Sequence, residues 1–219
     1  METYDTLLEK YAGVAFEKQY SLVDLIGDSD WGVDMETGLI SFGDRLSAPM
    51  QILGTYSYDS ATWLWAWANE ASNIPRELQK EANFLREFGE DNKVEFLTMD
   101  EYKMEPTDVH SLGLIASGMF GSSAYYAGDY GDGILLVTIK DERIDDVAYN
   151  EQARILSVFP EIARIFAVNH KRALSSYLEA KEYAVTMNNN KLSACKATNS
   201  ISAEFDDMGR LLNISGEIK

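Results

Sequence analysis

Hydrophobic residues at the start of the chain recur at steps of three and four positions. Over residues 4–23 this spacing predicts an amphipathic helix that ends before Gly27. Two short runs follow, Trp31–Asp34 and Leu39–Phe42, separated by a turn in which Gly38 supplies a positive φ. The chain is therefore expected to begin with one helix and one β-hairpin.

Two further strands are predicted over residues 50–58 and 62–68, with Pro49 before the first and Asp59-Ser60 at the turn. A helix with Pro75 in its first turn is predicted next, and we expect Gly89 to close it. The pattern thus continues as four antiparallel strands followed by a second helix.

The middle of the chain contains a short strand candidate at residues 94–97 and a helix over 109–119 with Asp108 as its N-cap. Apolar runs over 122–127 and 134–140 then predict another hairpin, whose glycine- and aspartate-rich turn makes a flexible, acidic tip.

Residues 149–186 again have helical spacing, with Pro160 marking a break or a kink. Residues 201–218 alternate around Gly209 as a last hairpin. These elements predict an α+β fold: one domain over residues 1–219, with a large curved antiparallel sheet built from hairpins and helices packed mainly on one face.

The hairpin over residues 51–69 is the most informative segment, because alternate side chains of a strand share a face. Trp63, Trp65 and Trp67 therefore lie together. A turn at Asp59-Ser60 places Tyr56 opposite Trp63, Gly54 opposite Trp65 and Ile52 opposite Trp67, so that Gly54 leaves room for an indole.

Two interpretations of these rings remain open. They form either an aromatic-lined cleft for a small molecule or part of the hydrophobic core, since each buried aromatic removes about 150–250 Å² from water. Asn69, at the end of the strand, is similarly either a ligand contact or a turn and capping residue.

Several segments together resemble a bacterial family of unknown function. They are Trp31-x-Val-Asp34, Gly38-Leu-Ile-x-Phe42, Gln51-Ile-Leu-Gly-Thr55, Thr62-Trp-Leu-Trp-Ala-Trp-Ala-Asn69, Ile74-Pro75, His110-x-Leu and Tyr125-Tyr126. The resemblance covers about residues 30–140, a family-like core, and leaves a C-terminal long helix plus hairpin over 149–219. It implies a bacterial cytoplasmic protein, and it brings neither an established activity nor catalytic residues.

Composition and charge narrow the classes of partner. The chain has 36 acidic and 19 basic residues, a net charge of -17, which is the wrong sign for binding nucleic acid or an anionic membrane. The longest apolar run is far shorter than the roughly 20 residues of a membrane span. The single Cys195 excludes an internal disulfide and fits a reducing cytoplasm.

Candidate chemistry is sparse. His110, one turn into its helix, is the better candidate for a neutral base, with a structural role near the cap as the alternative. His170 is expected on a solvated basic face and Cys195 to be packed or idle. Paired carboxylates such as Asp28/Asp30 are too common to single out, and no zinc spacing, phosphate loop or hydrolase motif is found, so neither a metal nor a cofactor is predicted.

These observations favour a non-enzymatic binding module over an enzyme. Residues 1–108 carry a net charge of -14, against -3 for the rest, which indicates an acidic face for a basic protein partner. The first hypothesis is an acidic, immunity-like inhibitor of such a partner, and general solubility is the simpler explanation of the charge. The second is a small-molecule binder or enzyme that uses Tyr56, Trp63, Trp65, Trp67, Asn69 and His110.

Overall fold

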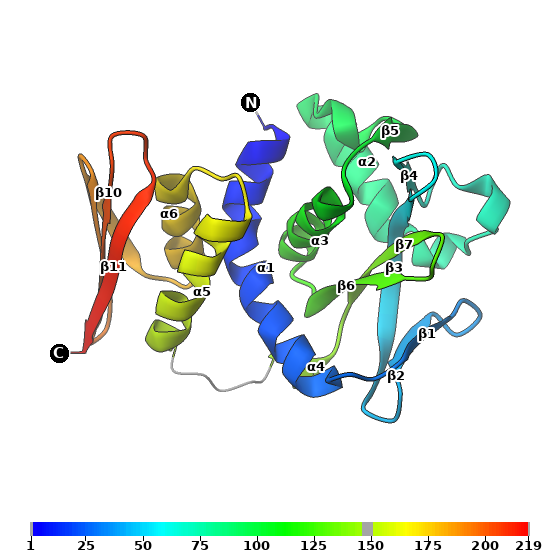
Figure 1. Ribbon diagram of the computed structural model, residues 1–219, viewed down its shortest axis with the longest axis horizontal. Coiled ribbons are helices and arrows are strands. Elements are labelled where there is room, and N and C mark those ends of the chain that lie inside the picture. Colours follow the sequence, from blue (N-terminus) through cyan, green and yellow to red (C-terminus); the bar gives the residue numbers. More distant parts are fainter. Residues whose placement is uncertain (1, 146–150, 219) are drawn as a thin grey trace.

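A computed structural model describes residues 2–145 and 151–218 of the chain. Two antiparallel sheets lie at opposite ends of the molecule, with helices between them (Figure 1). The predicted α+β class with a large antiparallel sheet is confirmed. No helix among residues 2–145 and 151–218 has the length and apolar character needed to cross a membrane.

Helix α1 (Tyr4–Ile26) begins and ends as the sequence predicts. Thr3 and Thr6 cap its start reciprocally, with the backbone N–H of Thr6 donating to the Thr3 hydroxyl at 3.2 Å. Gly27, with φ of 53°, ends it in a conformation that glycine tolerates best. The helix packs on α3 on one side and on α5 and α6 on the other, so it joins the two ends of the molecule (Figure 1).

The larger sheet has seven strands, all paired antiparallel. They are β1 (Trp31–Asp34), β2 (Leu39–Phe42), β3 (Leu46–Ser57), β4 (Thr62–Trp65), β5 (Glu101–Lys103), β6 (Ala124–Asp129) and β7 (Gly133–Ile139). Strand β3 is the central strand of this sheet, because it pairs with β2, β4 and β7. The predicted hairpins are confirmed, but Pro49 lies inside β3 rather than before it, opposite Leu39.

Three helices belong to this part of the chain: α2 (Lys80–Asn92), α3 (Pro106–Phe120) and α4 (Glu142–Asp145). The predicted end of α2 at Gly89 is wrong. Gly89 lies within the helix, where an added Cβ would be 2.7 Å from the Cβ of Leu97. The predicted strand at 94–97 is also wrong, since Glu95–Leu97 forms a 3₁₀ turn, as do Glu70–Ser72 and Arg76–Leu78.

The two faces of the large sheet are covered differently. Tyr125 and Thr138 are cross-strand neighbours on one face, where Tyr125 meets α3 and Thr138 donates a hydrogen bond to Glu81 of α2. Tyr126 points to the other face, where the rings of Trp31 and Phe42 from the first hairpin pack against it at 5.6 and 4.8 Å. The first hairpin thus curls over the face opposite α2 and α3.

The C-terminal part contains α5 (Glu151–Ile165), α6 (His170–Ala180) and a second sheet of β8 (Ala184–Asn188), β9 (Lys191–Lys196), β10 (Asn199–Phe205) and β11 (Leu211–Ile218). The predicted helix over 149–186 is therefore two helices and ends earlier. Residues 149 and 150 lie outside the described residues. Pro160 lies within α5, and the break comes instead before Asn169, whose side chain caps α6.

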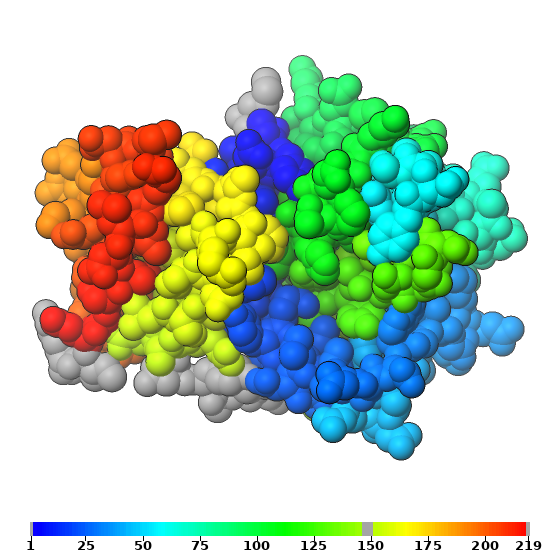
Figure 2. All heavy atoms as spheres, in the orientation of Figure 1, coloured from blue at the N-terminus to red at the C-terminus, as the bar shows by residue number. Residues whose placement is uncertain are grey.

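The contact between α1 and α6 is tight and partly polar. An added Cβ on Gly13 would lie 2.4 Å from the Cβ of Tyr177, so only glycine allows this approach. The Tyr177 hydroxyl donates to Glu17 at 2.6 Å, and Lys181 forms a salt bridge with the same carboxylate at 3.0 Å. Figure 2 shows the yellow α5–α6 segment lying directly against the blue helix α1.

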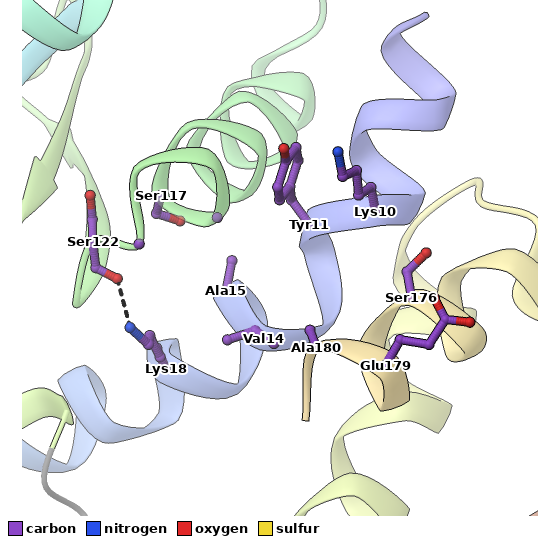
Figure 3. A pocket seen from close by; sticks show the side chains of 12 residues that line it. Lys10, Tyr11, Val14, Ala15, Lys18, Ser117, Ser122, Ser176, Glu179 and Ala180 are labelled. Atoms are coloured by element: carbon purple, nitrogen blue, oxygen red, sulfur yellow. Dashed lines mark hydrogen bonds between the residues drawn. The ribbon is translucent and has the colours of Figure 1, made fainter. Parts of the chain in front are cut away.

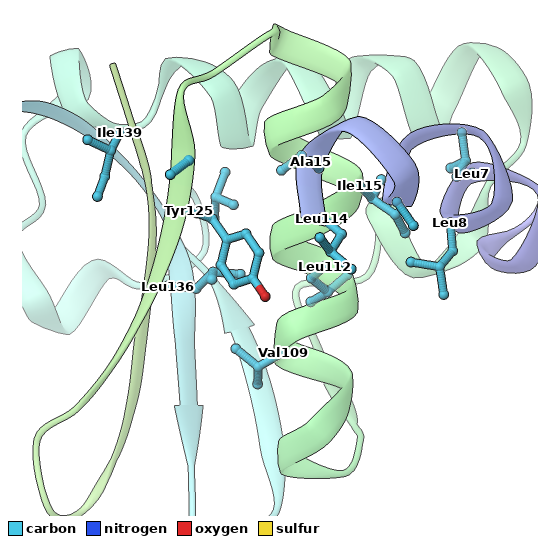
Figure 4. Packing of buried hydrophobic residues seen from close by; sticks show 14 of the residues in the cluster. Leu7, Leu8, Ala15, Val109, Leu112, Leu114, Ile115, Tyr125, Leu136 and Ile139 are labelled. Carbon is cyan, nitrogen blue, oxygen red and sulfur yellow. The ribbon is translucent and has the colours of Figure 1, made fainter. Parts of the chain in front are cut away.

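Helix α3 lies between α1 and the large sheet and is apolar on nearly all sides. Leu112, Leu114 and Ile115 are each at most 2% exposed. The ring of Tyr125 reaches from β6 toward α3 (Figure 4), where the missing side chain of Gly113 makes room for it. This packing determines where Tyr125 and the start of α3 lie, and therefore positions His110.

Candidate functional site

The aromatic hairpin has the predicted register. Tyr56 lies opposite Trp63 and Gly54 opposite Trp65. Gly54 does leave room for an indole, because a Cβ there would lie 2.5 Å from the Trp63 ring. Strand β4 ends at Trp65, however, so the expected pairing of Ile52 with Trp67 is not formed.

These rings are buried. Trp63 and Trp65 are 0% and 1% exposed, their rings make an edge contact at 5.3 Å, and Tyr56 is 3% exposed. The Trp65 Nε1–H donates to the backbone oxygen of Phe96 at 3.2 Å. At these three residues the structure supports the core interpretation over the aromatic cleft, because each side chain is almost fully buried and belongs to the hydrophobic core cluster.

Trp67 and Asn69 lie beyond the strand, at its end. Trp67 is half-buried, and the Arg86 guanidinium lies 4.4 Å from the centre of its ring. The Asn69 side chain accepts a hydrogen bond from the backbone N–H of Ser72 at 3.2 Å, which makes it the cap of a 3₁₀ turn. Ligand binding by either residue stays a prediction.

His110 lines a separate cavity of about 400 Å³, called here the His110 cavity. It is bounded by the first half of α1, the start of α3, Tyr125 of β6 and the segment between α5 and α6. The lining residues are Tyr4, Asp5, Leu8, Phe16, Thr107, Asp108, His110, Ser111, Tyr125, Ile165, Phe166 and Ala167. The blue, green and yellow segments that supply most of these residues meet on the face shown in Figure 2.

Helix capping places His110 at this cavity. Helix α3 begins at Pro106, and Glu105, not Asp108 as expected, is its N-cap. Asp108 sits three residues later and accepts a hydrogen bond from the backbone N–H of Glu105 at 3.1 Å. The predicted helix therefore exists but begins three residues earlier than expected, and its cap is a reciprocal pair in which Asp108 is the second member.

The His110 imidazole and the phenols of Tyr4 and Tyr125 favour their uncharged forms, because desolvation by burial is the main cause of each pKa shift. Burial lowers the pKa of His110 and raises that of Tyr125. It also raises the pKa of Tyr4 to about 12. The His110 Nδ1 lies 3.2 Å from the Tyr125 hydroxyl, its hydrogen-bond partner. At neutral pH the cavity therefore presents a neutral imidazole and two protonated phenols.

This arrangement lacks the pairing expected of a nucleophile and its base. Within residues 2–145 and 151–218, His110 is hydrogen-bonded to Tyr125 and to no serine, threonine or cysteine. His170 accepts a hydrogen bond at Nδ1 from the backbone N–H of Leu211 at 2.8 Å, which ties α6 to β11 rather than leaving it on a solvated face. Cys195 is exposed on β9.

A second cavity, of about 380 Å³, lies on the other flank of α1, between α3 and α6 (Figure 3). Its walls are mostly small residues. Lys18 enters it but donates to the backbone oxygen of Ser122 at 2.9 Å and forms a salt bridge with Asp145 at 2.8 Å. The lining also includes Lys10, Glu179 and three serines, which Figure 3 labels. Lys18 is thus already engaged by groups of the protein itself.

Carboxylates are numerous, but those that the structure describes do not gather into one site. In the part of the chain that the structure describes, no three histidine, cysteine, aspartate or glutamate side chains gather closely enough to hold a metal ion. Burial raises the pKa of Glu81, while its hydrogen bond from Thr138 acts in the opposite direction.

The turns β3–β4 and β6–β7 form one surface at the edge of the large sheet. We call it the acidic tip and define it as Tyr58, Asp59, Asp129, Tyr130 and Asp132. Tyr58 and Tyr130 are 42% and 50% exposed. The Tyr58 hydroxyl donates to Asp129 at 2.9 Å, and its backbone N–H donates to the oxygen of Asp132 at 3.1 Å. The sequence predicts the acidic turn, but not that Tyr58 joins it to the neighbouring β3–β4 turn.

Comparison with known proteins gives one match. A family model described as a family of unknown function (DUF6882) matches residues 5–141, more than half of the chain, from α1 to the end of the large sheet. No curated protein and no solved structure matches the chain. The matched region contains the acidic tip and the α1, α3 and β6 walls of the His110 cavity, but not α5, α6 or the second sheet.

Proposed function

The chain belongs to the family of unknown function (DUF6882), and from this premise we propose that its family part is a non-enzymatic module that binds a basic protein through the acidic tip. The cytoplasm is the compartment we propose for this binding. If the basic surface that the module covers is the active-site cleft of the partner, binding inhibits that partner.

The observation that carries this proposal is the distribution of charge. Residues 1–145 contain 27 acidic and 10 basic residues, a net charge of -17, whereas residues 146–219 contain nine of each. The entire net charge therefore belongs to the part that holds the large sheet. An acidic surface of this kind accelerates association with a basic partner and disfavours acidic ones.

Besides electrostatic attraction, the acidic tip offers side chains that can make short-range contacts with a partner. Its two exposed tyrosines offer apolar area with a polar end, and tyrosine is enriched among the residues that dominate binding energy at protein interfaces. The hydrogen bonds from Tyr58 to Asp129 and Asp132 hold the two turns together before a partner arrives. Such preorganisation lowers the entropic cost of association.

The test uses two variants of equal charge. The tip variant carries Asp59→Asn and Asp132→Asn, and the control carries Glu87→Gln and Asp91→Asn on α2; all four side chains are exposed. Each tagged full-length chain is purified gently from its host and examined by native mass spectrometry. We expect the wild type and the control to retain one basic protein in stoichiometric amount, and the tip variant to lose most of it.

The association rate of the isolated pair then provides a second criterion. Between low and high salt it should fall at least tenfold for the wild type and less for the tip variant, because salt screens charge steering. A bare mass for the wild type, equal loss in both variants, or a rate that salt does not change would each contradict the proposal.

A further inference from the structure

The His110 cavity has the size and the position of a small-molecule site. Its volume of about 400 Å³ falls within the roughly 300–1,000 Å³ of known ligand pockets, which often lie where two parts of a protein meet. Here the family part contributes α1, α3 and β6, and the C-terminal part contributes residues 165–167. The cavity therefore exists only when both parts are present.

The charged residues that line the His110 cavity are acidic. Asp5 and Asp108 are the charged side chains among its twelve lining residues, and none of the twelve is lysine or arginine. Each aspartate lies in the first turn of a helix, α1 or α3, where the helix dipole stabilises a carboxylate without a cation. Arg172 lies near Asp5, but it is held by Glu9 through two hydrogen bonds of 2.6 and 2.9 Å.

The remaining walls are largely aromatic. Phe16 and Phe166 meet edge to face at 5.7 Å, and His110 and Tyr125 lie 6.0 Å apart at a similar angle. Tyr4 completes the set. Aromatic faces attract organic cations by about 0.5–2 kcal/mol each, depending on how far the cation is desolvated.

We propose that the His110 cavity binds a small organic cation, an ammonium group on an apolar body of about the size of a phenylethyl group. The ammonium lies within reach of Asp5 and Asp108, and the apolar body packs among Phe16, Phe166 and Tyr125. His110 and Tyr125 offer a neutral donor and acceptor pair beside it. An anion meets the carboxylates of Asp5 and Asp108 in a lining without lysine or arginine, and a neutral analogue gains only the apolar contacts.

The test compares three probes that share a phenylethyl group: 2-phenylethylammonium, 2-phenylethanol and 3-phenylpropanoate. Each is titrated into the full-length chain while backbone amide signals are followed by NMR. We expect the cation to cause saturable shifts at residues 107–111 and 165–167, with an affinity at least tenfold above that of the alcohol. The carboxylate should cause none that saturate at these positions.

Asp108→Asn and Asp5→Asn together should weaken the cation at least tenfold, while Asp28→Asn, an exposed aspartate outside the cavity, should leave it unchanged. Asparagine keeps an oxygen that is able to accept from Glu105, so the start of α3 is retained. Should the double variant not fold, the comparison of the three probes on the wild type still decides. Equal binding of alcohol and cation, tighter binding of the carboxylate, or no saturable shift at these residues would overturn the proposal.

This site is independent of the acidic tip. The two share no residue, so a failure of protein binding by the tip variant leaves the cation titration unchanged.

Discussion

Replacing Gly13 by alanine tests the packing that holds the two parts of the molecule together. Gly13 lies inside α1, where alanine would favour the isolated helix by about 1 kcal/mol. In the folded chain the new Cβ would lie 2.4 Å from Cβ and Cγ of Tyr177 and 2.7 Å from its Cδ2. Ordinary contacts between carbon atoms are about 3.5–4.0 Å, so a shift of about 1 Å is required.

Tyr177 has little freedom to make that shift. It is 1% exposed, its hydroxyl is bound to Glu17, and the clashing Cβ is fixed to the backbone of α6. Overpacking of this kind costs about 1–3 kcal/mol. After the gain in helix propensity, we expect Gly13→Ala to lower the free energy of unfolding by about 1–2 kcal/mol.

Urea denaturation followed by circular dichroism measures this change as a lower midpoint with an unchanged slope. Tyr177→Gly supplies the control background, because it removes the clashing Cβ together with the ring. Adding Gly13→Ala there should raise stability by about 1 kcal/mol, through helix propensity alone. A Gly13→Ala protein as stable as the wild type would refute the steric argument, and so would the same loss of stability in both backgrounds.

Two further predictions concern the buried rings and a histidine. Trp65→Phe removes the hydrogen bond to Phe96 and leaves a gap, so we expect the free energy of unfolding to fall by about 1–3 kcal/mol in denaturation experiments. Unchanged stability together with ligand-dependent tryptophan emission would instead support the interpretation of an aromatic cleft. Burial lowers the pKa of His170, helped by Arg210 and opposed by Asp206. Its neutral form, which accepts from Leu211, therefore contributes stability that is complete above pH 6.5 and lost as the pH falls through the folded pKa. His170→Asn should flatten the decline in stability below pH 6.5, and an unchanged pH profile would count against this role.

The sequence predicts elements well where one local signal dominates. Helix α1 has its capping residues and terminal glycine in place, and the strand pairing of Trp63 with Tyr56 follows from alternation and the turn alone. Errors occur where packing between distant elements decides. Gly89 has the pattern of a helix end, yet the close approach of Leu97 accounts for it. Pro160 is tolerated inside α5, and the turn before Asn169 ends that region instead.

The candidate site was only partly predictable. His110 stands out because histidine is rare in this chain, but its neighbours come from α1, β6 and residues 165–167, up to about 100 positions away. No periodicity in the sequence predicts that these distant segments lie next to one another. The acidic tip has a clear signal in its aspartates, whereas Tyr58 joins it only through a turn-to-turn hydrogen bond. The tryptophans give the strongest sequence signal of all, and two of them, Trp63 and Trp65, belong to the core.

The position of α1 between the two sheets has a consequence for the order in which the chain folds. The ribosome makes this helix before the segments that follow it, and two of its buried carboxylates, Glu9 and Glu17, have their cationic partners at Arg172 and Lys181, more than 160 residues later. During synthesis the large sheet and α3 can assemble on one side of α1 while its other side remains exposed to solvent. Closure of such distant contacts is slow, so the nascent family part passes through a stage with an exposed, acidic and apolar helix face.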